Sequence, residues 1–241
     1  MRLLGIDTAT AAAGIAIVDG DGRVLAEARH ATQSRGADLL VAIDRLCREA
    51  GVDPADLDAI AIGAGPGSFT GLRIGMATAK GIAFAANRPL WAVSSLAALA
   101  DDAAHELAGD PRRGGVICAA LDARRGEVFA GCFQGGVALA TERVLAPEEL
   151  APWIAELARG GDVPVPMSFA GDAIEAHAAL AALAHVWLAA RTPSGAAVAR
   201  LALAGARVDI TRGGAPTYIR PSEAEVKYPD GVPGALRRRD P

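Results

Sequence analysis

The sequence predicts an α/β fold built from two related halves. Strand and helix patterns follow one another in the first half in the order β-β-β-α-β-α-β-α. A second hairpin pattern begins at residue 114, although no clear sequence repeat relates the two halves. The chain has 241 residues and a hydrophobic content of 51%, so it is long enough to bury a substantial core without disulfide bonds.

The first half carries a signal for each expected element. The segment 3–7 is an apolar run typical of a buried strand, and 11–30 holds two strand patterns around an Asp-Gly turn. Apolar residues at three- and four-residue spacing predict a helix at 37–50, and Gly51 stands where that helix ends. The remaining expected elements are a strand at 59–64, a helix at 71–86, a strand at 90–93 and a helix capped by Ser94 or Ser95.

The second half begins with strand patterns at 114–123 and 126–133, joined by a tight turn at Arg124, Arg125 and Gly126. Less regular helix and strand patterns follow, and glycine and proline then interrupt the chain from residue 213 onward. We therefore expect an N-terminal half-domain at 1–105, a C-terminal half-domain at 106–212 and a tail at 213–241 that packs back on the body.

The composition excludes several classes of protein. A formal net charge of -4 with 22% charged residues does not suit a strongly basic nucleic-acid binder or a disordered tail, so any RNA contact needs a local patch or a partner. The three cysteines are too few and too scattered for a disulfide framework or a Cys-x-x-Cys metal site, and we expect them to be reduced core residues. No signal-peptide core or membrane-spanning stretch is present, so the expected location is the cytoplasm.

The stretch GAGPGSFTG at 63–71 has the setting of an anion-binding loop, between a strand and a helix N-terminus. It is not a P-loop, because Leu72 and Arg73 follow the last glycine where that loop needs Lys and Ser or Thr. A dinucleotide fingerprint needs an acidic residue about 20 positions on, and none occurs at 59–100. A nucleophile elbow needs a glycine two positions before and two positions after its serine, and neither of these positions around Ser68 is glycine. We therefore expect a turn or cap role for Ser68.

The helix that follows has a smooth stripe of small residues at four-residue steps, from Gly71 to Ala83. Such a stripe lets another helix approach closely, and nearly all other positions of this helix are apolar or small. Either the helix is enclosed in its own domain or it meets a partner protein. Leu40 lies off the main apolar face of the preceding helix and favours a partner. The candidate interface residues are Leu39, Leu40, Ile43, Leu46, Cys47, Gly71, Leu72, Gly75, Met76, Ala79 and Ala83.

Other candidate sites are sparse, and no catalytic residue or metal site is predicted. The four histidines lack the spacing of metal ligands. Asp7 ends the first strand, where its carboxylate either faces a bound metal or phosphate or caps the strand end, and Asp122 is placed similarly in the second half. Arg124 and Arg125 either form a solvated turn or contact an anion such as a tRNA phosphate.

Several motifs together resemble the bacterial TsaB family, also called YeaZ. They are IDTAT at 6–10, GPGSFTGLRIG at 65–75, AKGIA at 79–83, SSLAALA at 94–100, LDARRGEVFAG at 121–131 and PTYIRP at 216–221. The resemblance implies the actin-like ATPase (sugar kinase) fold, with two ribonuclease-H-like half-domains of which the second is reduced. It also implies that Asp7, Thr8, Asp122 and Gly171 are remnants of nucleotide-binding loops. The arginines of DARRGEV and the single glycine before Asp172 depart from an ATPase pattern.

The resemblance further implies a subunit without catalytic activity of its own. TsaB-like proteins pair with the paralogue TsaD and with the ATPase TsaE, and the complex modifies the adenosine beside the anticodon of tRNAs that read codons starting with A. The complex uses ATP and threonylcarbamoyl-AMP, whereas no cofactor is expected on this chain. TsaD carries the metal through an His-x-x-x-His pair, which this sequence lacks. Pairing is expected through helices of the first half, and a homodimer is compatible with the apolar helices when the chain is alone.

Two alternative functions remain at the level of sequence. An autonomous phosphotransferase of the same fold would bind ATP through Asp7 and Asp122, but phosphate-loop glycines are missing. A peptidase reading rests only on an old grouping of these proteins with glycoproteases, and neither a metal pair nor a nucleophile elbow supports it.

Overall fold

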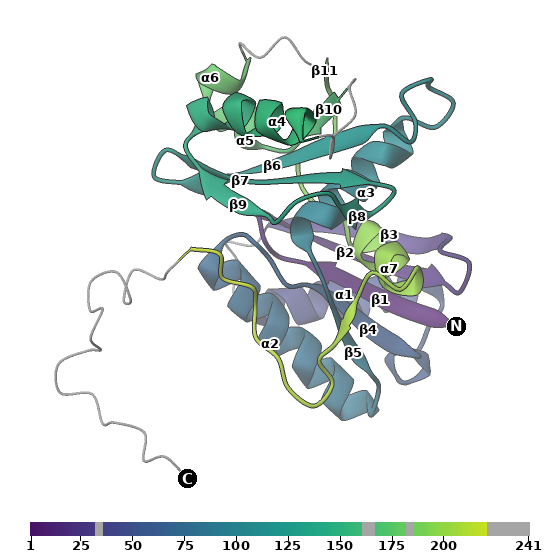
Figure 1. Cartoon of the computed structure of the whole chain (residues 1–241). Helices are drawn as coiled ribbons and strands as arrows, with labels where there is room; N and C mark the ends of the chain where they lie inside the picture. The colour runs from purple at the N-terminus through teal and green to yellow at the C-terminus, as the bar shows by residue number, and fades with distance from the viewer. Residues whose placement is uncertain (32–35, 161–166, 182–185, 221–241) are drawn as a thin grey trace, which may run out of the picture.

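The computed structural model describes residues 1–31, 36–160, 167–181 and 186–220. Two six-stranded sheets form two halves of the molecule, one above the other, with helices packed against each (Figure 1). This architecture confirms the α/β class and the two halves that the order of strand and helix patterns predicts.

The first sheet has the strand order β12-β5-β4-β1-β2-β3. The first three expected strands form a meander, since β1 pairs antiparallel with β2 and β2 with β3, while β4 lies parallel to β1 and to β5. Both faces of the central strands are covered, which explains their continuous apolar sequences. The strands are β1 (Arg2–Asp7), β2 (Ala12–Asp19), β3 (Val24–Ala31), β4 (Ala59–Gly63), β5 (Leu90–Val93) and β12 (Val208–Asp209).

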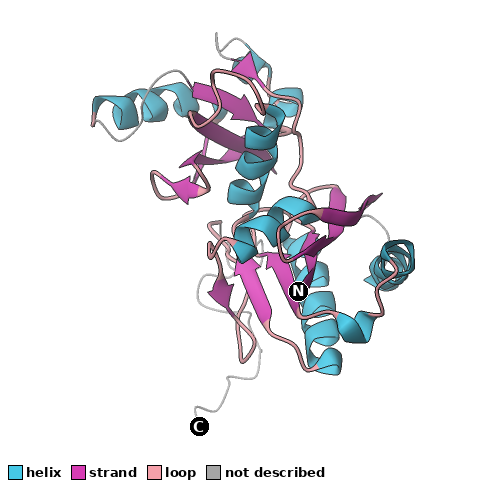
Figure 2. Ribbon diagram, turned by 90° about the vertical axis from the view of Figure 1, so that its right-hand side faces the viewer, coloured by secondary structure: helices cyan, strands magenta, loops and turns pink. Residues whose placement is uncertain are grey.

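Helices cover both faces of this sheet (Figure 2). On one face, α1 (Gly36–Ala50) and α2 (Phe69–Ala86) bury Ile43 and Met76 against Ile6 and neighbouring strand residues. On the other face lies α7 (Gly195–Leu203), packed on alternate strand residues such as Leu3, while α3 (Ser95–Glu106) packs on α7 and on the second sheet. The period-two alternation of the strands thus divides the first half into two apolar layers.

The second sheet has the order β11-β10-β6-β7-β8, with β9 also paired to β7. Its predicted hairpin is present, and Cys118 lies directly opposite Cys132 across it. All three cysteines are free and buried, as expected from the sequence. The elements of this half are β6 (Val116–Arg124), β7 (Glu127–Gln134), β8 (Val137–Ala138), β9 (Arg143–Leu145), α4 (Leu150–Arg159), β10 (Met167–Ala170), α5 (Ala173–Ala176), α6 (Ala178–Ala181) and β11 (Val186–Trp187); 3₁₀ turns η1 (Pro54–Asp56) and η2 (Pro147–Glu149) precede β4 and α4.

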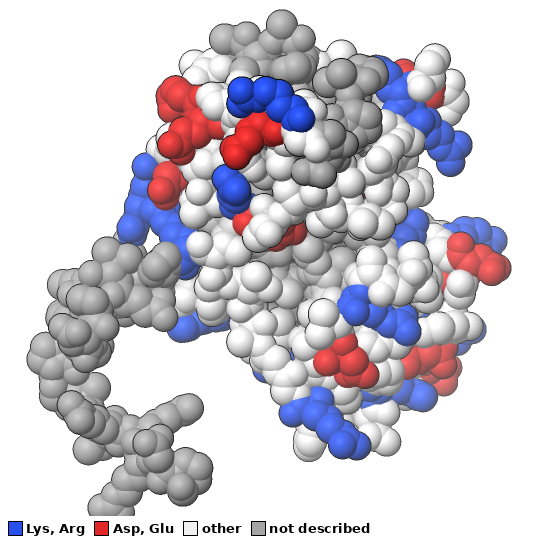
Figure 3. Space-filling model, viewed as in Figure 1, with Lys and Arg blue, Asp and Glu red and all other residues white. Residues whose placement is uncertain are grey.

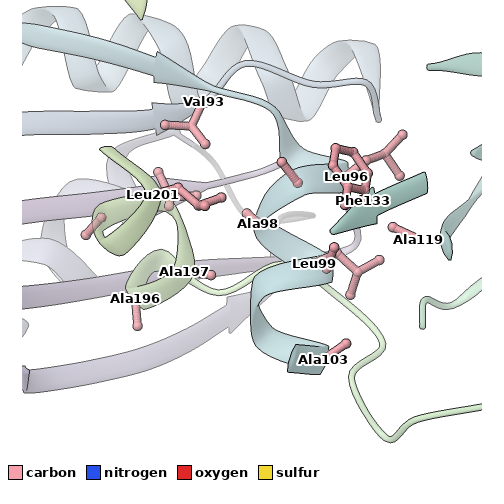
Figure 4. Packing of buried hydrophobic residues seen from close by; sticks show 14 of the residues in the cluster. Val93, Leu96, Ala98, Leu99, Ala103, Ala119, Phe133, Ala196, Ala197 and Leu201 are labelled. Carbon is pink, nitrogen blue, oxygen red and sulfur yellow. The ribbon is translucent and has the colours of Figure 1, made fainter. Parts of the chain in front are cut away.

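A shared core joins the two halves around α3. Leu96 and Leu99 of α3 belong to the same apolar cluster as Phe133 of the second sheet and Leu201 of α7 (Figure 4). The Ser94 hydroxyl, which caps α3, also donates a hydrogen bond to Glu142 of the second half. The apolar core therefore extends without interruption from one half to the other around α3.

The predicted boundary of the second half-domain at residue 212 is wrong. Helix α7 packs on the first sheet, and β12 pairs antiparallel with β5 at its edge. The approach of α7 is close, because a Cβ atom added at Gly5 would lie 2.0 Å from the carbonyl oxygen of Gly195. The apolar pattern of α7 shows that the helix is buried but not which sheet covers it. Of the predicted tail, 213–220 runs along α2 and 221–241 lies outside the described residues.

Candidate functional site

A cleft with a volume of about 860 Å³ lies between the two halves. One wall is the turn after β1, at 9–11, with the loop into α2, and the facing wall is the β6–β7 hairpin with Asp172. Residues 217–220 of the tail line a third side. The lining residues are Ala9, Thr10, Ala11, Pro66, Gly67, Ser68, Phe69, Thr70, Gly71, Arg73, Leu121, Asp122, Ala123, Arg124, Arg125, Phe129, Asp172, Thr217, Tyr218, Ile219 and Arg220.

The loop at 63–71 serves to start α2 and to hold it against β1. The Ser68 side chain accepts a hydrogen bond of 3.3 Å from the Gly71 amide, so the serine is the N-cap of α2. The Ser68 amide itself donates to the carbonyl oxygen of Ala9 at 2.7 Å. The predicted cap role of Ser68 is thus confirmed.

Asp7 does not face the cleft, which corrects one of its two predicted roles. Its side chain is fully buried, Oδ2 accepts a hydrogen bond of 2.6 Å from Ser95 Oγ, and Oδ1 accepts one of 2.8 Å from the Ala9 amide. Burial raises the pKa of Asp7 to about 6, against the opposing effect of these hydrogen bonds. The aspartate closes the end of the strand from inside the protein and is not available to a metal or phosphate in this conformation.

The glycine stripe of α2 faces the protein's own first strand. The Thr8 hydroxyl donates to the Gly71 carbonyl oxygen at 2.8 Å, and a Cβ atom at Gly75 would lie 2.1 Å from the same hydroxyl oxygen. Thr8 therefore packs between two glycines instead of lining the cleft. The other small residues of the stripe continue this inward face.

These contacts show that most of the predicted partner surface is wrong. The apolar face of each helix turns toward the sheet of the same chain, because packing against these strands removes its apolar surface from water. Leu40 is the exception, with 48% of its surface exposed. The buried members of the predicted set are Leu39, Ile43, Leu46, Cys47, Gly71, Leu72, Gly75, Met76, Ala79 and Ala83.

Large apolar residues nevertheless lie exposed on the outer sides of α1 and α2, although α1 also carries the exposed ion pairs Arg45–Glu49 and Arg48–Asp44. Val41 on α1 is 67% exposed and Phe84 on α2 is 90% exposed, and the sequence reasoning named neither. Their signal was present in the sequence, since both are large apolar residues off the inward face of their helix. The α1–α2 face is defined here by the exposed residues Leu40, Val41, Ala77, Gly81, Phe84 and Ala85.

On the opposite wall of the cleft, Asp122 stands at the centre of a polar cluster. Its Oδ2 forms an ion pair of 3.2 Å with Arg124 Nη1, and His177 Nε2 lies 3.3 Å from its Oδ1. Asp172 Oδ1 accepts a hydrogen bond of 2.9 Å from the Asp122 amide, and burial raises the pKa of Asp172. Gly171 packs against the backbone of Ala120, where an added Cβ would lie 1.8 Å from the carbonyl oxygen.

Arg124 and Arg125, for which the sequence left a solvated turn and an anion contact open, both line the cleft. Their φ angles are 62° and 56°, a left-handed conformation that costs free energy in residues with a side chain. Figure 3 shows Lys and Arg side chains gathered on the left of the molecule, at the level where the two halves meet. Whether the two arginines contact an anion stays a prediction.

This arrangement does not fit a metal–nucleotide complex held by Asp7 and Asp122. Asp7 is enclosed, and the oxygens of Asp122 already accept from Arg124 and approach His177. Among the described residues, no group of three or more His, Cys, Asp or Glu side chains is placed to hold a metal ion. We therefore assign no ligand chemistry to these two aspartates.

Comparisons with known proteins agree with the fold and the motifs. A family model described as TsaD, tRNA N6-adenosine threonylcarbamoyltransferase, matches residues 27–225. The tRNA threonylcarbamoyladenosine biosynthesis protein TsaB of Bacillus subtilis strain 168 is 31% identical over 236 residues, which are 95% of this chain and 98% of that protein. The chain belongs to the TsaB family. Its Escherichia coli K12 member is 37% identical over 155 residues, 61% of this chain and 64% of that protein.

Solved structures show which fold this member of the TsaB family shares with other proteins. YeaZ from Pseudomonas aeruginosa has a TM-score of 0.72 and 33% identity, covering 90% of this chain and 99% of that one. Component A of (R)-2-hydroxyglutaryl-CoA dehydratase from Acidaminococcus fermentans, at 12% identity and a TM-score of 0.53, shares the fold over 86% of this chain and 99% of its own. The actin-like ATPase fold is thereby confirmed. Within the described residues, no helix is long and apolar enough to cross a membrane.

Proposed function

We propose that this chain is a non-catalytic scaffold subunit in tRNA threonylcarbamoyladenosine biosynthesis, which acts in the cytoplasm. It pairs with the TsaD paralogue, together with the ATPase TsaE, and supports transfer of the threonylcarbamoyl group to the adenosine beside the anticodon. ATP and threonylcarbamoyl-AMP are used by the complex and not by this chain alone. The curated relatives support the pathway through their names.

The observation that carries the pairing is the α1–α2 face. Phe84 on α2 exposes 90% of its surface and Val41 on α1 exposes 67%, and the small exposed residues Ala77 and Gly81 precede Phe84 on α2. A contiguous exposed apolar patch marks a surface that is covered in an assembly, and we take these residues as parts of one such patch. Small residues next to large ones also permit two helices of a partner to approach closely. A second copy of this chain is the expected occupant when TsaD is absent.

The enclosure of Asp7 supports a scaffold over an autonomous phosphotransferase. That alternative requires Asp7 and Asp122 to face a bound nucleotide, whereas Asp7 has no exposed surface and is hydrogen-bonded to Ser95. Nothing in the described part of the chain supports the peptidase alternative. The scaffold is therefore the function that the geometry supports best.

The test uses two valines with nearly equal exposure on different surfaces. Val41→Glu alters the α1–α2 face, and Val137→Glu alters β8 of the second half, where the valine is 66% exposed. Each variant is mixed with TsaD and the mass of the complex is measured by light scattering coupled to size exclusion. Modification of tRNA is then assayed with TsaD, TsaE, ATP and threonylcarbamoyl-AMP.

We expect Val41→Glu to lose the complex and the modification, because a charge buried at an apolar interface is strongly unfavourable. Val137→Glu is expected to behave as the parent protein, and the parent alone to modify no tRNA. Full complex formation by Val41→Glu would place the partner elsewhere. Modification of tRNA by the parent without TsaD would overturn the non-catalytic role.

A further inference from the structure

The described end of the chain, 213–220, forms a strap along α2 toward the second half (Figure 1). The main chain of its first part is hydrogen-bonded to the first half. Lys80 Nζ donates to the Gly214 carbonyl oxygen at 2.6 Å, and the Thr217 amide donates to the Ala64 carbonyl oxygen at 2.7 Å. This end of the strap is therefore fixed to both α2 and the end of β4.

The middle of the strap rests on an aromatic and cationic group at the start of α2. The rings of Tyr218 and Phe69 lie 5.1 Å apart between centroids. The Arg73 guanidinium stacks 3.9 Å from the Phe69 ring and its Nε donates to the Tyr218 hydroxyl at 3.3 Å. These three side chains form one stacked unit, which orients the strap toward the cleft.

The last described residue reaches the second half. Arg220 Nη1 donates to the Ala123 carbonyl oxygen at 2.7 Å, and Nη2 forms an ion pair of 3.1 Å with Glu127 Oε2. Ala123 and Glu127 flank the turn of the β6–β7 hairpin, so one guanidinium holds both sides of that turn. Because the planar Arg220 guanidinium bonds to both Ala123 and Glu127, its orientation relative to the hairpin is fixed.

The strap thus joins both halves next to the cleft. It lines the cleft with Thr217, Tyr218, Ile219 and Arg220, between the α2 wall and the hairpin wall. The apolar core around α3 and α7 also connects the halves, and Ile219 packs against that core from the strap. A body held along its core and by a strap at the cleft resists rotation of one half relative to the other.

We propose that the strap sets the relative position of the two halves, and hence the width of the cleft, through Arg220 and Tyr218. Helix α2 carries both the base of the strap and part of the α1–α2 face. The strap consequently connects the position of the β6–β7 hairpin to the helix that bears the proposed partner surface. The claim about cleft width stands independently of the proposed function, because it concerns only contacts within this chain.

The test measures the distance between the halves in the isolated chain by double electron–electron resonance. Spin labels are attached at Ala55→Cys on the first half and Glu148→Cys on the second, both exposed positions, while the native cysteines are buried. The distance distribution is compared for Arg220→Ala, Tyr218→Ala and the unmodified strap. Arg45→Ala is the matched control, since its 2.9 Å pair with Glu49 lies within α1.

We expect Arg220→Ala and Tyr218→Ala to shift the distribution to longer distances or to broaden it, and Arg45→Ala to leave it unchanged. Distributions that coincide with the parent in both strap variants, with circular dichroism showing folded protein, would overturn the proposal. If Arg220→Ala does not fold, Glu127→Gln removes the ion pair while keeping the side-chain size, and its distribution decides in the same way. Because no partner or tRNA is present, a negative result leaves the scaffold role untouched.

Discussion

The hydroxyl of Ser95, in the first turn of α3, donates a 2.6 Å hydrogen bond to Oδ2 of Asp7, at the end of β1. Gly63 of β4 leaves room for this carboxylate, since a Cβ atom there would lie 1.8 Å from the same oxygen. Three elements that are far apart in the sequence therefore enclose one acidic group. Such a group stabilises the fold in a way that depends on pH.

The pKa of Asp7 leads to the first prediction. Burial raises it from 3.8 to about 6, so the folded protein holds the proton more tightly than the unfolded chain. The resulting stabilisation is fully present below the unfolded pKa and is lost as pH rises through about 6. We expect wild type to lose about 2–3 kcal/mol of unfolding free energy relative to Asp7→Asn between pH 4 and pH 7. Urea unfolding at the two pH values measures this difference, and parallel pH profiles would contradict it.

The glycines of α2 give a second prediction with its own control. Gly75→Ala places a Cβ against the Thr8 hydroxyl, and such overpacking costs about 1–3 kcal/mol. Gly81→Ala is on the same helix, where an added Cβ meets nothing within 4 Å, and better helix propensity stabilises it by up to about 1 kcal/mol. Thermal unfolding of both variants tests the assignment. Equal shifts would mean that Gly75 does not face the core.

The turn of the β6–β7 hairpin provides the third prediction. Arg125 has a φ of 56°, which glycine adopts without the steric cost of a side chain. We expect Arg125→Gly to raise the unfolding free energy by roughly 0.5–1 kcal/mol. A stabilised variant would show that arginine is kept here at a cost, as at sites where strain accompanies function. A destabilised variant in urea unfolding would mean that the contacts of the Arg125 side chain outweigh the strain.

The cysteines allow a fourth prediction. A hydrogen bond with Cys132 and burial raise the pKa of the Cys118 thiol well above its usual value, and burial raises that of Cys47. Thiols that are protonated and enclosed react slowly, because the thiolate is the nucleophile. In native protein at pH 8, a thiol reagent should label none of the three within minutes, and all three after addition of urea. Rapid stoichiometric labelling of native protein would show that the cysteine thiols are accessible, which contradicts the prediction.

Much of the fold could be predicted because local patterns report burial directly. The apolar runs of β1 and β4 and the three- and four-residue spacing of α1 identify elements whose faces are covered, whatever covers them. Ser68 and Ser94 mark helix starts through a short-range hydrogen bond that needs no tertiary contact. The motifs also identified the family, since they depend on residue identity and order alone.

The candidate site was less predictable because it depends on which surface meets which. The spacing of Gly75 and Ala79 in the sequence is the same whether a strand of this chain or a helix of a partner covers them. Only the position of Thr8 in the folded chain distinguishes the two arrangements. In the same way, the sequence could not show that Ser95 would enclose Asp7 or that α7 would return to the first sheet.

By itself, the sequence determined the α/β class, the helix caps, the buried cysteines and the TsaB family, because each follows from local periodicity or from motif identity. The tertiary structure decided the inward direction of the glycine stripe, the exposure of Phe84, the raised pKa of Asp7 and the contact of Arg220 with the β6–β7 hairpin. These features depend on contacts between residues that are distant in the chain and come together only on folding. Such contacts determine the burial of a residue, its electrostatic environment and the shape of the surface.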